Sequence, residues 1–346
     1  MSSSAQTQPR QPSPTEHLMQ FAGGYWPSVS LYIVAKLGIA DLLKGGPRPV
    51  AELAAATATN ADALYRVLRA LASVGIFTET APRVFALTPP AEPLRSDIPG
   101  SLRAMVQWIA DPFHLRVYAE MMHSVKTGQP AMEHVFGKPA FEYLETDPEE
   151  MEVFHAAMTS FSAYAVPAIL EAYDFSSIET LIDLGGGHGF LLTSILQKYP
   201  ALKGILFDME KVYHGRRTAV EECGMTSRCQ VVSGDFFAGV PTGGDAFIMK
   251  HIIHDWDDDK ATLILSNCRK ALAGKPKAKV LVVDAIVPPA NEPHFAKFLD
   301  LEMLVIPGGR ERTEEEFRRL FANAELKLTR IIPTKSPVAI IEGVPA

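Results

Sequence analysis

The chain has 346 residues, a length at which two domains are more common than one. Apolar residues make up 47% of it and charged residues 21%, an ordinary globular composition that excludes a disordered or fibrous protein. Lys and Arg number 33 against 40 Asp and Glu, and the resulting net charge of −7 argues against nucleic acid as a partner.

The cysteine content and the N-terminal sequence indicate in which cellular compartment the protein is expected. The three cysteines, Cys223, Cys229 and Cys268, form no C-x-x-C pair, so they predict neither a disulfide framework nor a zinc site. The sequence has no run of about 18 uncharged apolar residues, and its first residues lack the apolar stretch of a secretory signal. We therefore expect a soluble, cytoplasmic protein with no membrane partner.

The first half of the chain is predicted to be mainly helical. Residues 1–15 are rich in Ser, Gln and Pro and predict a disordered tail. Apolar residues recur at helical spacing over 17–43, and 50–94 reads as two short helices followed by two short strands, the outline of a winged helix. Its second helix offers only Arg66 and Arg69, so packing or dimerisation is favoured over DNA binding.

The second half alternates short apolar strands with helices. This alternation begins at Glu179, after a helical stretch over about 100–175, and predicts a parallel sheet covered by helices on both faces. Residues 326–344 read as a closing antiparallel hairpin. The predicted fold class is α/β, with a disordered tail (1–15), a helical and winged-helix domain (16–165) and a Rossmann-like domain (166–346).

A glycine-rich turn follows the first of these strands. Gly185–Gly189 contains four glycines, which let backbone N–H groups approach a ligand closely. A dinucleotide fingerprint would place glycine at position 190, where this chain has Phe190, so an NAD site is disfavoured. Binding of a nucleoside without phosphates is less affected by Phe190. The structural alternative is that the glycines form only a tight turn and bind no ligand.

Two acidic residues end the next two strands. Asp208 lies 19 positions after Gly189, where nucleoside sites place a carboxylate that accepts both ribose hydroxyls, although Asp208 could also cap the following helix. Asp235 could accept a hydrogen bond from an adenine amino group while Phe236 covers the ring. Together the three strand ends predict a nucleoside site.

Five segments together resemble one enzyme family. They are Gly185–Gly189, Asp208, Gly234–Phe236, the run KHIIHDW at 250–256 and the run PGGRERT at 307–313. The chain is thereby similar, from about residue 15 onward, to the S-adenosylmethionine-dependent small-molecule O-methyltransferases, which include plant caffeic acid and flavonoid, acetylserotonin and bacterial tailoring enzymes. The resemblance implies a class I methyltransferase sheet, a homodimer formed through the N-terminal domain, secondary metabolism and S-adenosylmethionine converted to S-adenosylhomocysteine without a metal.

The resemblance also implies roles for individual residues. His254 matches the general base, with Glu311 and Asp284 as the carboxylates beside it. The implied cofactor-binding residues are Gly185, Gly187, Asp208, Asp235, Phe236, Lys250, Trp256 and Ser162. The implied substrate-binding residues are Phe154, Met158, Asp255 and Met303. His251 and His254 form an H-x-x-H pattern, but the sequence shows no third metal ligand.

The implied reaction is a direct displacement on a methyl group by a small, hydroxylated aromatic molecule. A phenol with a pKa near ~10 and a histidine near ~6.5 differ by roughly 3.5 units, or about 4.8 kcal/mol, which favours proton removal concerted with attack. Three alternatives stay open: a relative that has drifted to a non-methylating reaction, an NAD-dependent oxidoreductase, and a winged-helix regulator.

Overall fold

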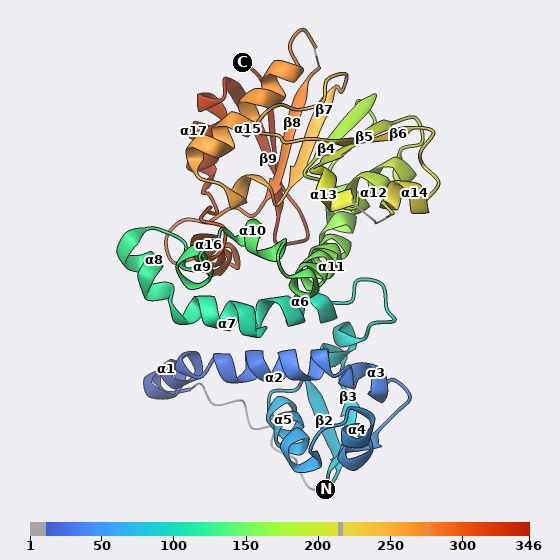
Figure 1. Ribbon diagram of the computed structural model, residues 1–346, viewed down its shortest axis with the longest axis vertical. Helices are drawn as coiled ribbons and strands as arrows, with labels where there is room; N and C mark the ends of the chain where they lie inside the picture. Colours follow the sequence, from blue (N-terminus) through green and yellow to red (C-terminus); the bar gives the residue numbers. More distant parts are fainter. Residues whose placement is uncertain (1–11, 214–216, 276) are drawn as a thin grey trace, which may run out of the picture. The chain divides into compact units, whose positions relative to one another are not determined.

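A computed structural model describes residues 12–213, 217–275 and 277–346 (Figure 1). The chain forms two compact units, Met1–His114 and Leu115–Ala346, and each is described separately. The predicted domain boundary at 165–166 differs from this division. Helix α11 (Pro148–Ala172) runs unbroken through that position. The sequence changes there from a helical pattern to alternating strands and helices, but both patterns belong to the same compact unit.

Most of the predicted disordered tail, residues 1–11, lies outside the described residues. Helix α1 (Pro14–Ala22) begins at Pro14, close to the predicted end of the tail at about residue 15. Ser13 Oγ accepts the N–H of Glu16, and the Glu16 carboxylate accepts the N–H of Ser13 in return. This capping box fixes the helix start within a segment whose composition alone suggested disorder.

The first unit contains a small sheet flanked by helices. Its three strands are ordered β1-β3-β2, and a buried cluster that includes Leu53, Leu68, Phe77 and Phe85 fills the space between sheet and helices. Two helices followed by a hairpin occur in the order that the sequence predicted. Its further elements are α2 (Tyr25–Lys36), α3 (Ile39–Leu43), β1 (Arg48–Pro49), α4 (Val50–Ala56), α5 (Ala61–Ser73), β2 (Phe77–Ala81), β3 (Val84–Leu87), the 3-10 helix η1 (Pro89–Leu94) and α6 (Arg103–Ile109).

The second unit is built on a seven-stranded sheet of order β6-β5-β4-β7-β8-β10-β9. Its strands are β4 (Thr180–Leu184), β5 (Lys203–Asp208), β6 (Cys229–Ser233), β7 (Ala246–Lys250), β8 (Lys279–Asp284), β9 (Leu326–Pro333) and β10 (Ala339–Pro345). The first five run parallel, and β10 pairs antiparallel with both β8 and β9. The predicted mostly parallel sheet with an antiparallel hairpin is confirmed.

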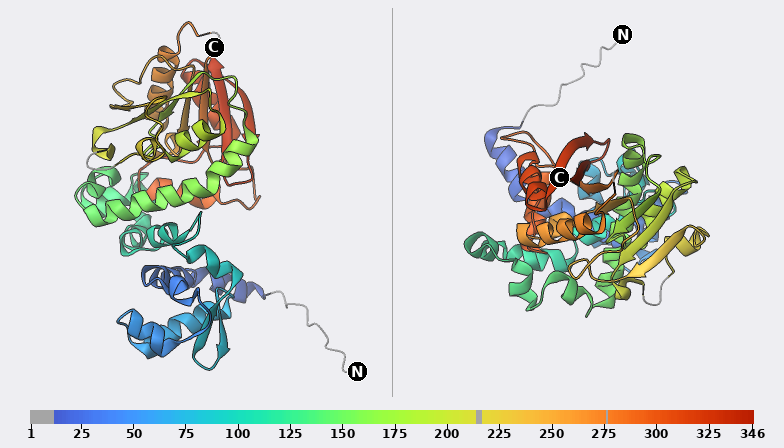
Figure 2. Two further views of the ribbon diagram at one scale, coloured as in Figure 1. Left: turned by 90° about the vertical axis from the view of Figure 1, so that its right-hand side faces the viewer. Right: turned by 90° about the horizontal axis from the view of Figure 1, so that it is seen from above.

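Helices cover both faces of this sheet. The helices α15 (Asp258–Ala271) and α17 (Glu314–Asn323) pack with one buried cluster, and α11 and α12 (Phe190–Lys198) pack with another that also includes Val220 of α14 (Ala219–Glu222) (Figure 1). The two views of Figure 2 show the same layers from other sides. The central strands β4, β7 and β8 are almost wholly apolar because neither of their faces meets water, whereas the edge strands β6 and β9 expose several side chains.

The remaining helices lie before α11, after β5, after β7 and beyond β8. They are α7 (Pro112–Ala119), within which the division into units falls, α8 (Met121–Thr127), α9 (Ala131–Phe136), α10 (Ala140–Leu144), α13 (Glu210–Tyr213), the 3-10 helix η2 (Ile253–Asp255) and α16 (Ala296–Val305). By length and hydropathy alone α11 could cross a membrane, but its Ala165, Val166 and Ile169 belong to the buried core of the sheet.

Candidate active site

A large cavity of about 1280 Å³ lies at the carboxyl ends of β4, β5 and β7 and along α11. Ligand pockets of single small molecules span roughly 300–1,000 Å³, so this cavity has room for two ligands. Its position agrees with the rule that parallel α/β sheets bind ligands beyond the carboxyl ends of their strands.

The glycine turn and Asp208 lie side by side at one wall of the cavity. The N–H of Gly187 donates to Asp208 Oδ2 at 2.8 Å, and the N–H of Met209 donates to Asp208 Oδ1 at 2.7 Å. Burial raises the pKa of Asp208, against the two N–H donors that lower it. Because each carboxylate oxygen has a further lone pair, the fixed carboxylate can accept two hydroxyls of a diol.

The backbone conformation of this turn requires glycine. Gly185 has a φ of +69°, and a Cβ there would lie 2.4 Å from Ile252 Cδ1. Gly187 also has positive φ, but a Cβ at that position would meet no atom within 4 Å. The turn is therefore tightly packed behind Gly185 and open on the side of Gly187, which lines the cavity.

Asp235 and Phe236 follow β6 and also line the cavity. Asp235 Oδ1 accepts the N–H of Phe237 at 2.8 Å, so the loop turns back on its own carboxylate. The side-chain amide of Asn267 on α15 donates to the carbonyl oxygens of Phe236 and Phe237 at 2.9 and 3.2 Å. Sequence reasoning missed Asn267, whose role depends on a contact between distant segments.

His254 forms a short, buried polar contact with Glu311 near the cavity. Its Nδ1 lies 2.6 Å from Glu311 Oε1, and both side chains are almost wholly buried, with 8% and 0% exposed. The N–H of Glu311 donates to Asp300 of α16 at 2.8 Å, which fixes the glutamate from behind. A buried carboxylate on Nδ1 sets the tautomer and leaves Nε2 as the reactive nitrogen.

The reactive nitrogen of His254 faces Asp255. His254 Nε2 lies 3.5 Å from Asp255 Oδ1, and Asp255, unlike His254, lines the cavity. Burial lowers the pKa of His254, but the charges of Glu311, Asp255 and Asp284 outweigh burial and raise the pKa to about 10. Burial raises the pKa of Asp255 to about 6, against the opposing charge of His254.

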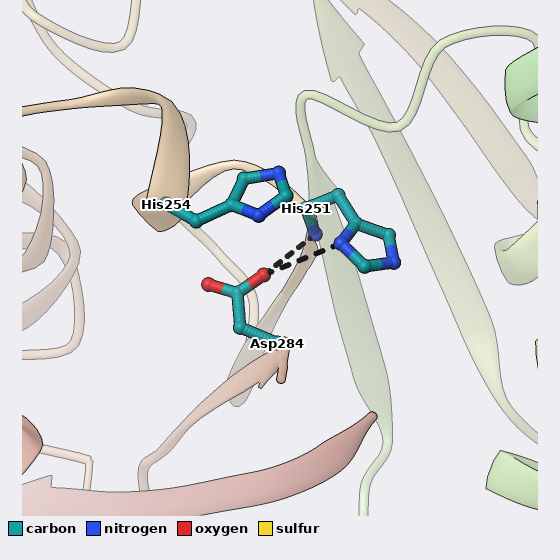
Figure 3. A group of neighbouring side chains, drawn as sticks. All are labelled: His251, His254 and Asp284. Atoms are coloured by element: carbon teal, nitrogen blue, oxygen red, sulfur yellow. Dashed lines mark hydrogen bonds and ion pairs between the residues drawn. The ribbon is translucent and has the colours of Figure 1, made fainter. Parts of the chain in front are cut away.

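Asp284, the second predicted partner of His254, is bonded to a different residue. Its Oδ1 accepts the backbone N–H of His251 at 3.0 Å and lies 3.8 Å from His251 Nδ1 (Figure 3). No hydrogen bond joins Asp284 to His254 among the described residues, although the charge of Asp284 still acts on His254. The reason is local: β8 ends at Asp284 beside the end of β7, where the short aspartate side chain reaches only the backbone that follows β7.

The structure also supplies the third candidate metal ligand that the sequence lacked. His251, His254 and Asp284 each offer one ligand atom, and these atoms lie within 4.8 Å of one another (Figure 3). However, Asp284 Oδ1 already accepts a backbone N–H, and His254 Nδ1 is bonded to Glu311.

The structure places most of the other predicted site residues at the cavity. Its lining includes Phe154, Met158, Ser162, Lys250 and Trp256. Burial lowers the pKa of Lys250 to about 8, against the neighbouring carboxylates. Ser162 Oγ donates within its own helix to the Met158 carbonyl oxygen at 2.8 Å, so its hydroxyl hydrogen is already in use.

Met303 is the exception. It is buried in the last turns of α16 and is not among the residues that line the cavity, so its substrate contact stays a prediction. Its carbonyl oxygen accepts the N–H of Gly308, which ties the end of α16 to the following turn. Met303 therefore faces the packed interior of the unit.

Comparisons with known proteins agree with this site. The O-methyltransferase domain model matches residues 118–327, and the O-methyltransferase dimerisation domain model matches residues 19–96. The chain belongs to the O-methyltransferase family.

Individual relatives match along nearly the whole chain. The phenazine O-methyltransferase PhzM of Lysobacter antibioticus is 44% identical over 95% of this chain and 95% of its own length. The crystal structure of LaPhzM has a TM-score of 0.91 at 43% identity, covering 97% of this chain and all of that one. CalO1, a methyltransferase in calicheamicin biosynthesis solved with S-adenosylhomocysteine (SAH), has a TM-score of 0.85 at 36% identity, covering 97% of this chain and all of that one.

The enzyme is an S-adenosylmethionine-dependent O-methyltransferase of the type that tailors secondary metabolites. Its cavity suits that cofactor chemically. Two lining residues, Asp183 and Trp256, carry buried polar atoms with no hydrogen-bond partner among the described residues. Burial raises the pKa of Asp183 to about 7, in a wall that also contains Asp208, Asp235 and Asp255. An acidic cavity with unpaired polar atoms favours a cationic, polar ligand.

Two residues of the PGGRERT run hold the methyltransferase site together, and the sequence assigned no role to either. A Cβ at Gly309 would lie 2.0 Å from the carbonyl oxygen of His254, so only glycine allows this close approach. Arg312 is 1% exposed and donates to the carbonyl oxygens of Ile253 and Trp256 at 3.1 and 2.9 Å. It also forms two hydrogen bonds with Asp258, at 3.0 and 2.8 Å. Arg312 thereby clamps the turn that presents His254.

Replacing this clamp is expected to damage both stability and activity. Arg312→Met leaves two buried carbonyl oxygens without donors, so we expect the free energy of unfolding to fall by about 3 kcal/mol. Displacement of His254 is expected to lower kcat/KM by about 10²-fold. Urea unfolding and steady-state assays measure the two effects. Arg310→Met is the matched control, because Arg310 is half exposed with its ion-pair atoms 3.7–3.9 Å away. Equal effects of the two substitutions would contradict the clamp.

Proposed function

We propose that the enzyme methylates a hydroxyl group of a planar aromatic small molecule, with His254 as the general base. The observation that carries this proposal is the buried 2.6 Å contact between His254 Nδ1 and Glu311. The other ring nitrogen of His254, Nε2, faces Asp255, which is a residue of the cavity wall. A histidine held in this way can accept a proton from an acceptor hydroxyl at Nε2.

The cavity wall supports an aromatic acceptor. Phe141 lies between Phe154 and Trp256, with ring centroids 6.3 and 6.2 Å away, and all three residues line the cavity together with Met151 and Met158. Such walls favour flat apolar rings, because rings pack well against offset or edge-on rings. The relative PhzM acts, by its name, on a phenazine, which is a planar aromatic system.

The cofactor is proposed to bind along the strand ends. Asp208 would accept the ribose hydroxyls, while Asp235 and Phe236 would hold the adenine. Gly185, Gly187, Lys250, Trp256 and Ser162 would complete the wall, as the lining of the cavity supports. S-adenosylmethionine supplies an electrophilic methyl group, so the remaining task of the chain is to orient the acceptor and take up its proton.

The raised pKa of His254 makes that proton transfer easier than the ordinary pKa values suggest. An unperturbed histidine is a weaker base than a phenolate by roughly 3.5 units, or about 4.8 kcal/mol. With the His254 pKa raised to about 10, that difference almost vanishes. The buried carboxylates therefore match the base to a phenolic or enolic hydroxyl, and an aliphatic hydroxyl stays out of its range.

Asp255 is proposed to share the acceptor with His254. Its carboxylate lies 3.5 Å from Nε2, on the side of the cavity, so an arriving hydroxyl must enter beside it. In that position Asp255 can accept a hydrogen bond from a second polar group of the acceptor. Its charge also stabilises the imidazolium that forms when His254 takes up the proton.

His254→Ala tests the proposed base. We expect labelled-methyl transfer from S-adenosylmethionine to a panel of phenols, naphthols, flavonoids and hydroxyphenazines to fall by about 10²- to 10⁴-fold. SAH affinity, measured by calorimetry, is expected to stay within about threefold, since hydrogen bonds to the cofactor are unchanged. His134→Ala serves as the control, because His134 is exposed on α9 and does not line the cavity.

Retained methyl transfer in His254→Ala would refute the base. Failure of the wild-type enzyme on every acceptor, with SAH still bound, would instead favour a relative that has drifted to a non-methylating reaction. Binding of NADH in place of SAH would point to an oxidoreductase.

Glu311→Gln tests the electrostatic coupling through the pH profile. Removing the largest attractive charge on His254 should lower the histidine pKa, so the rising limb of kcat/KM against pH is expected to move to lower pH. The maximum of kcat/KM should fall, because the weaker base meets the same phenol. Both effects are checked by steady-state rates measured from about pH 6 to about pH 11, a range that spans the ordinary pKa values of histidine and phenol. An unmoved rising limb would contradict the coupling.

We also propose that the enzyme works as a homodimer in the cytoplasm, with the first unit at the interface. The dimerisation-domain match supports dimer formation, and α1 and the start of α2 expose several large apolar side chains. These are Leu18, Met19, Phe21, Tyr25 and Trp26, each at least 58% exposed. An exposed apolar face of this kind is typical of a protein–protein interface.

Charges on this face should prevent dimer formation. The double substitution Phe21→Glu and Trp26→Glu is expected to give a monomer in light scattering coupled to size-exclusion chromatography, because two carboxylates would be buried at the interface. Val74→Glu is the control, since Val74 is 62% exposed but lies at the end of α5, away from α1 and α2 in the sequence. A double variant that remains dimeric would place the interface elsewhere.

A further inference from the structure

His251 is a buried polar side chain that the proposed mechanism does not use. It follows β7, lines the cavity and has a side chain only 9% exposed. Its ring centroid lies 5.0 Å from that of Phe161 and 4.8 Å from that of His254. His251 therefore lies immediately beside the proposed base.

The surroundings of His251 determine which of its nitrogens carries the proton. Nδ1 lies 3.8 Å from Asp284 Oδ1, and the same oxygen accepts the backbone N–H of His251, whereas Nε2 points away from Asp284 (Figure 3). Burial, followed by the positive charges of Lys250 and His254, lowers the pKa of His251 well below its usual value, so the ring is neutral. A neutral ring with a carboxylate near Nδ1 keeps its hydrogen there and leaves a lone pair at Nε2.

That lone pair has no protein partner. Nε2 of His251 is buried and makes no hydrogen bond among the described residues. Leaving a buried acceptor unpaired costs about 1–3 kcal/mol, so such an atom at a cavity wall is best explained by a ligand that donates to it.

We propose that His251 is a specificity-determining residue whose Nε2 accepts a hydrogen bond from an O–H or N–H next to the hydroxyl that is methylated. The enzyme then prefers aromatic acceptors with two neighbouring polar groups, such as catechols and 2-aminophenols, over phenols with a single hydroxyl. This inference rests on the proposed function of His254, because the adjacent hydroxyl is the one that donates its proton to that residue.

Two substitutions separate the roles of the two nitrogens of His251. His251→Gln keeps a polar group near the position of Nε2, whereas His251→Asn keeps one only near the position of Nδ1. Asn is also well suited to the backbone, since residue 251 has a φ of +56°. Both variants lose the imidazole, so a difference between them reports the group that faces the cavity.

The probes are matched acceptor pairs: 2,3-dihydroxynaphthalene against 2-naphthol, and 3′,4′-dihydroxyflavone against 4′-hydroxyflavone. The measured quantity is the ratio of kcat/KM for the diol to that for the single hydroxyl. In His251→Asn this ratio is expected to fall about tenfold, and in His251→Gln to stay within about threefold of wild type, as loss of one hydrogen bond predicts. SAH affinity by calorimetry is expected to be unchanged in both variants.

Several results would overturn the inference. An equal loss for diol and single hydroxyl, or a weaker SAH affinity, would show that His251 serves the cofactor or only the packing. Zn²⁺ binding to the wild-type protein that is lost in His251→Asn and Asp284→Asn would make it a metal ligand. A wild-type enzyme that is active but has no preference for the diol would refute this inference alone, whereas absence of all methyl transfer would refute the proposed function as well.

Discussion

The site depends on direct backbone contact between two segments that are distant in the sequence. The turn 251–256 after β7 carries the histidine, and the segment 307–312 carries the glutamate that pairs with it. The two approach closely because Gly309 has no Cβ to strike the His254 carbonyl oxygen, which also accepts the N–H of Arg310. Arg312 then satisfies the other carbonyl oxygens of the turn. Without this contact between the two segments, Glu311 would not reach Nδ1 of His254, and the tautomer of His254 would not be fixed.

Burial has two effects on this site. It raises the pKa values of Asp183 and Asp284 to about 7, which weakens these residues as anions. Burial also strengthens the attraction between Glu311 and His254, because charges interact more strongly where water is excluded. The result is a histidine whose raised pKa suits its proposed role as the base for a phenol, beside carboxyl groups that suit a cationic cofactor. The buried charges thus set both the pKa of His254 and the charge of the cavity.

The parts of the site that lie near strand ends could be predicted from the sequence. Gly185, Asp208 and Asp235 each occur within a few residues of an apolar run, and parallel strands bring their carboxyl ends to one edge. The pairing of His254 with Glu311, 57 residues apart, followed only from resemblance to a family. The partner of Asp284 and the position of Met303 could not be predicted, because they depend on side-chain length and helix rotation.

By itself, the sequence determined the order of strands and helices, the glycine turn and the carboxylates at the strand ends, since these follow from local patterns of apolar and small residues. It did not determine the extent of the compact units, because the long helix α11 continues through the predicted boundary. Only the tertiary structure decided that Arg312 clamps the turn that carries His254 and that His251 has a buried nitrogen without a hydrogen-bond partner among the described residues. Both depend on contacts between distant segments, and such contacts leave no local periodicity in the chain.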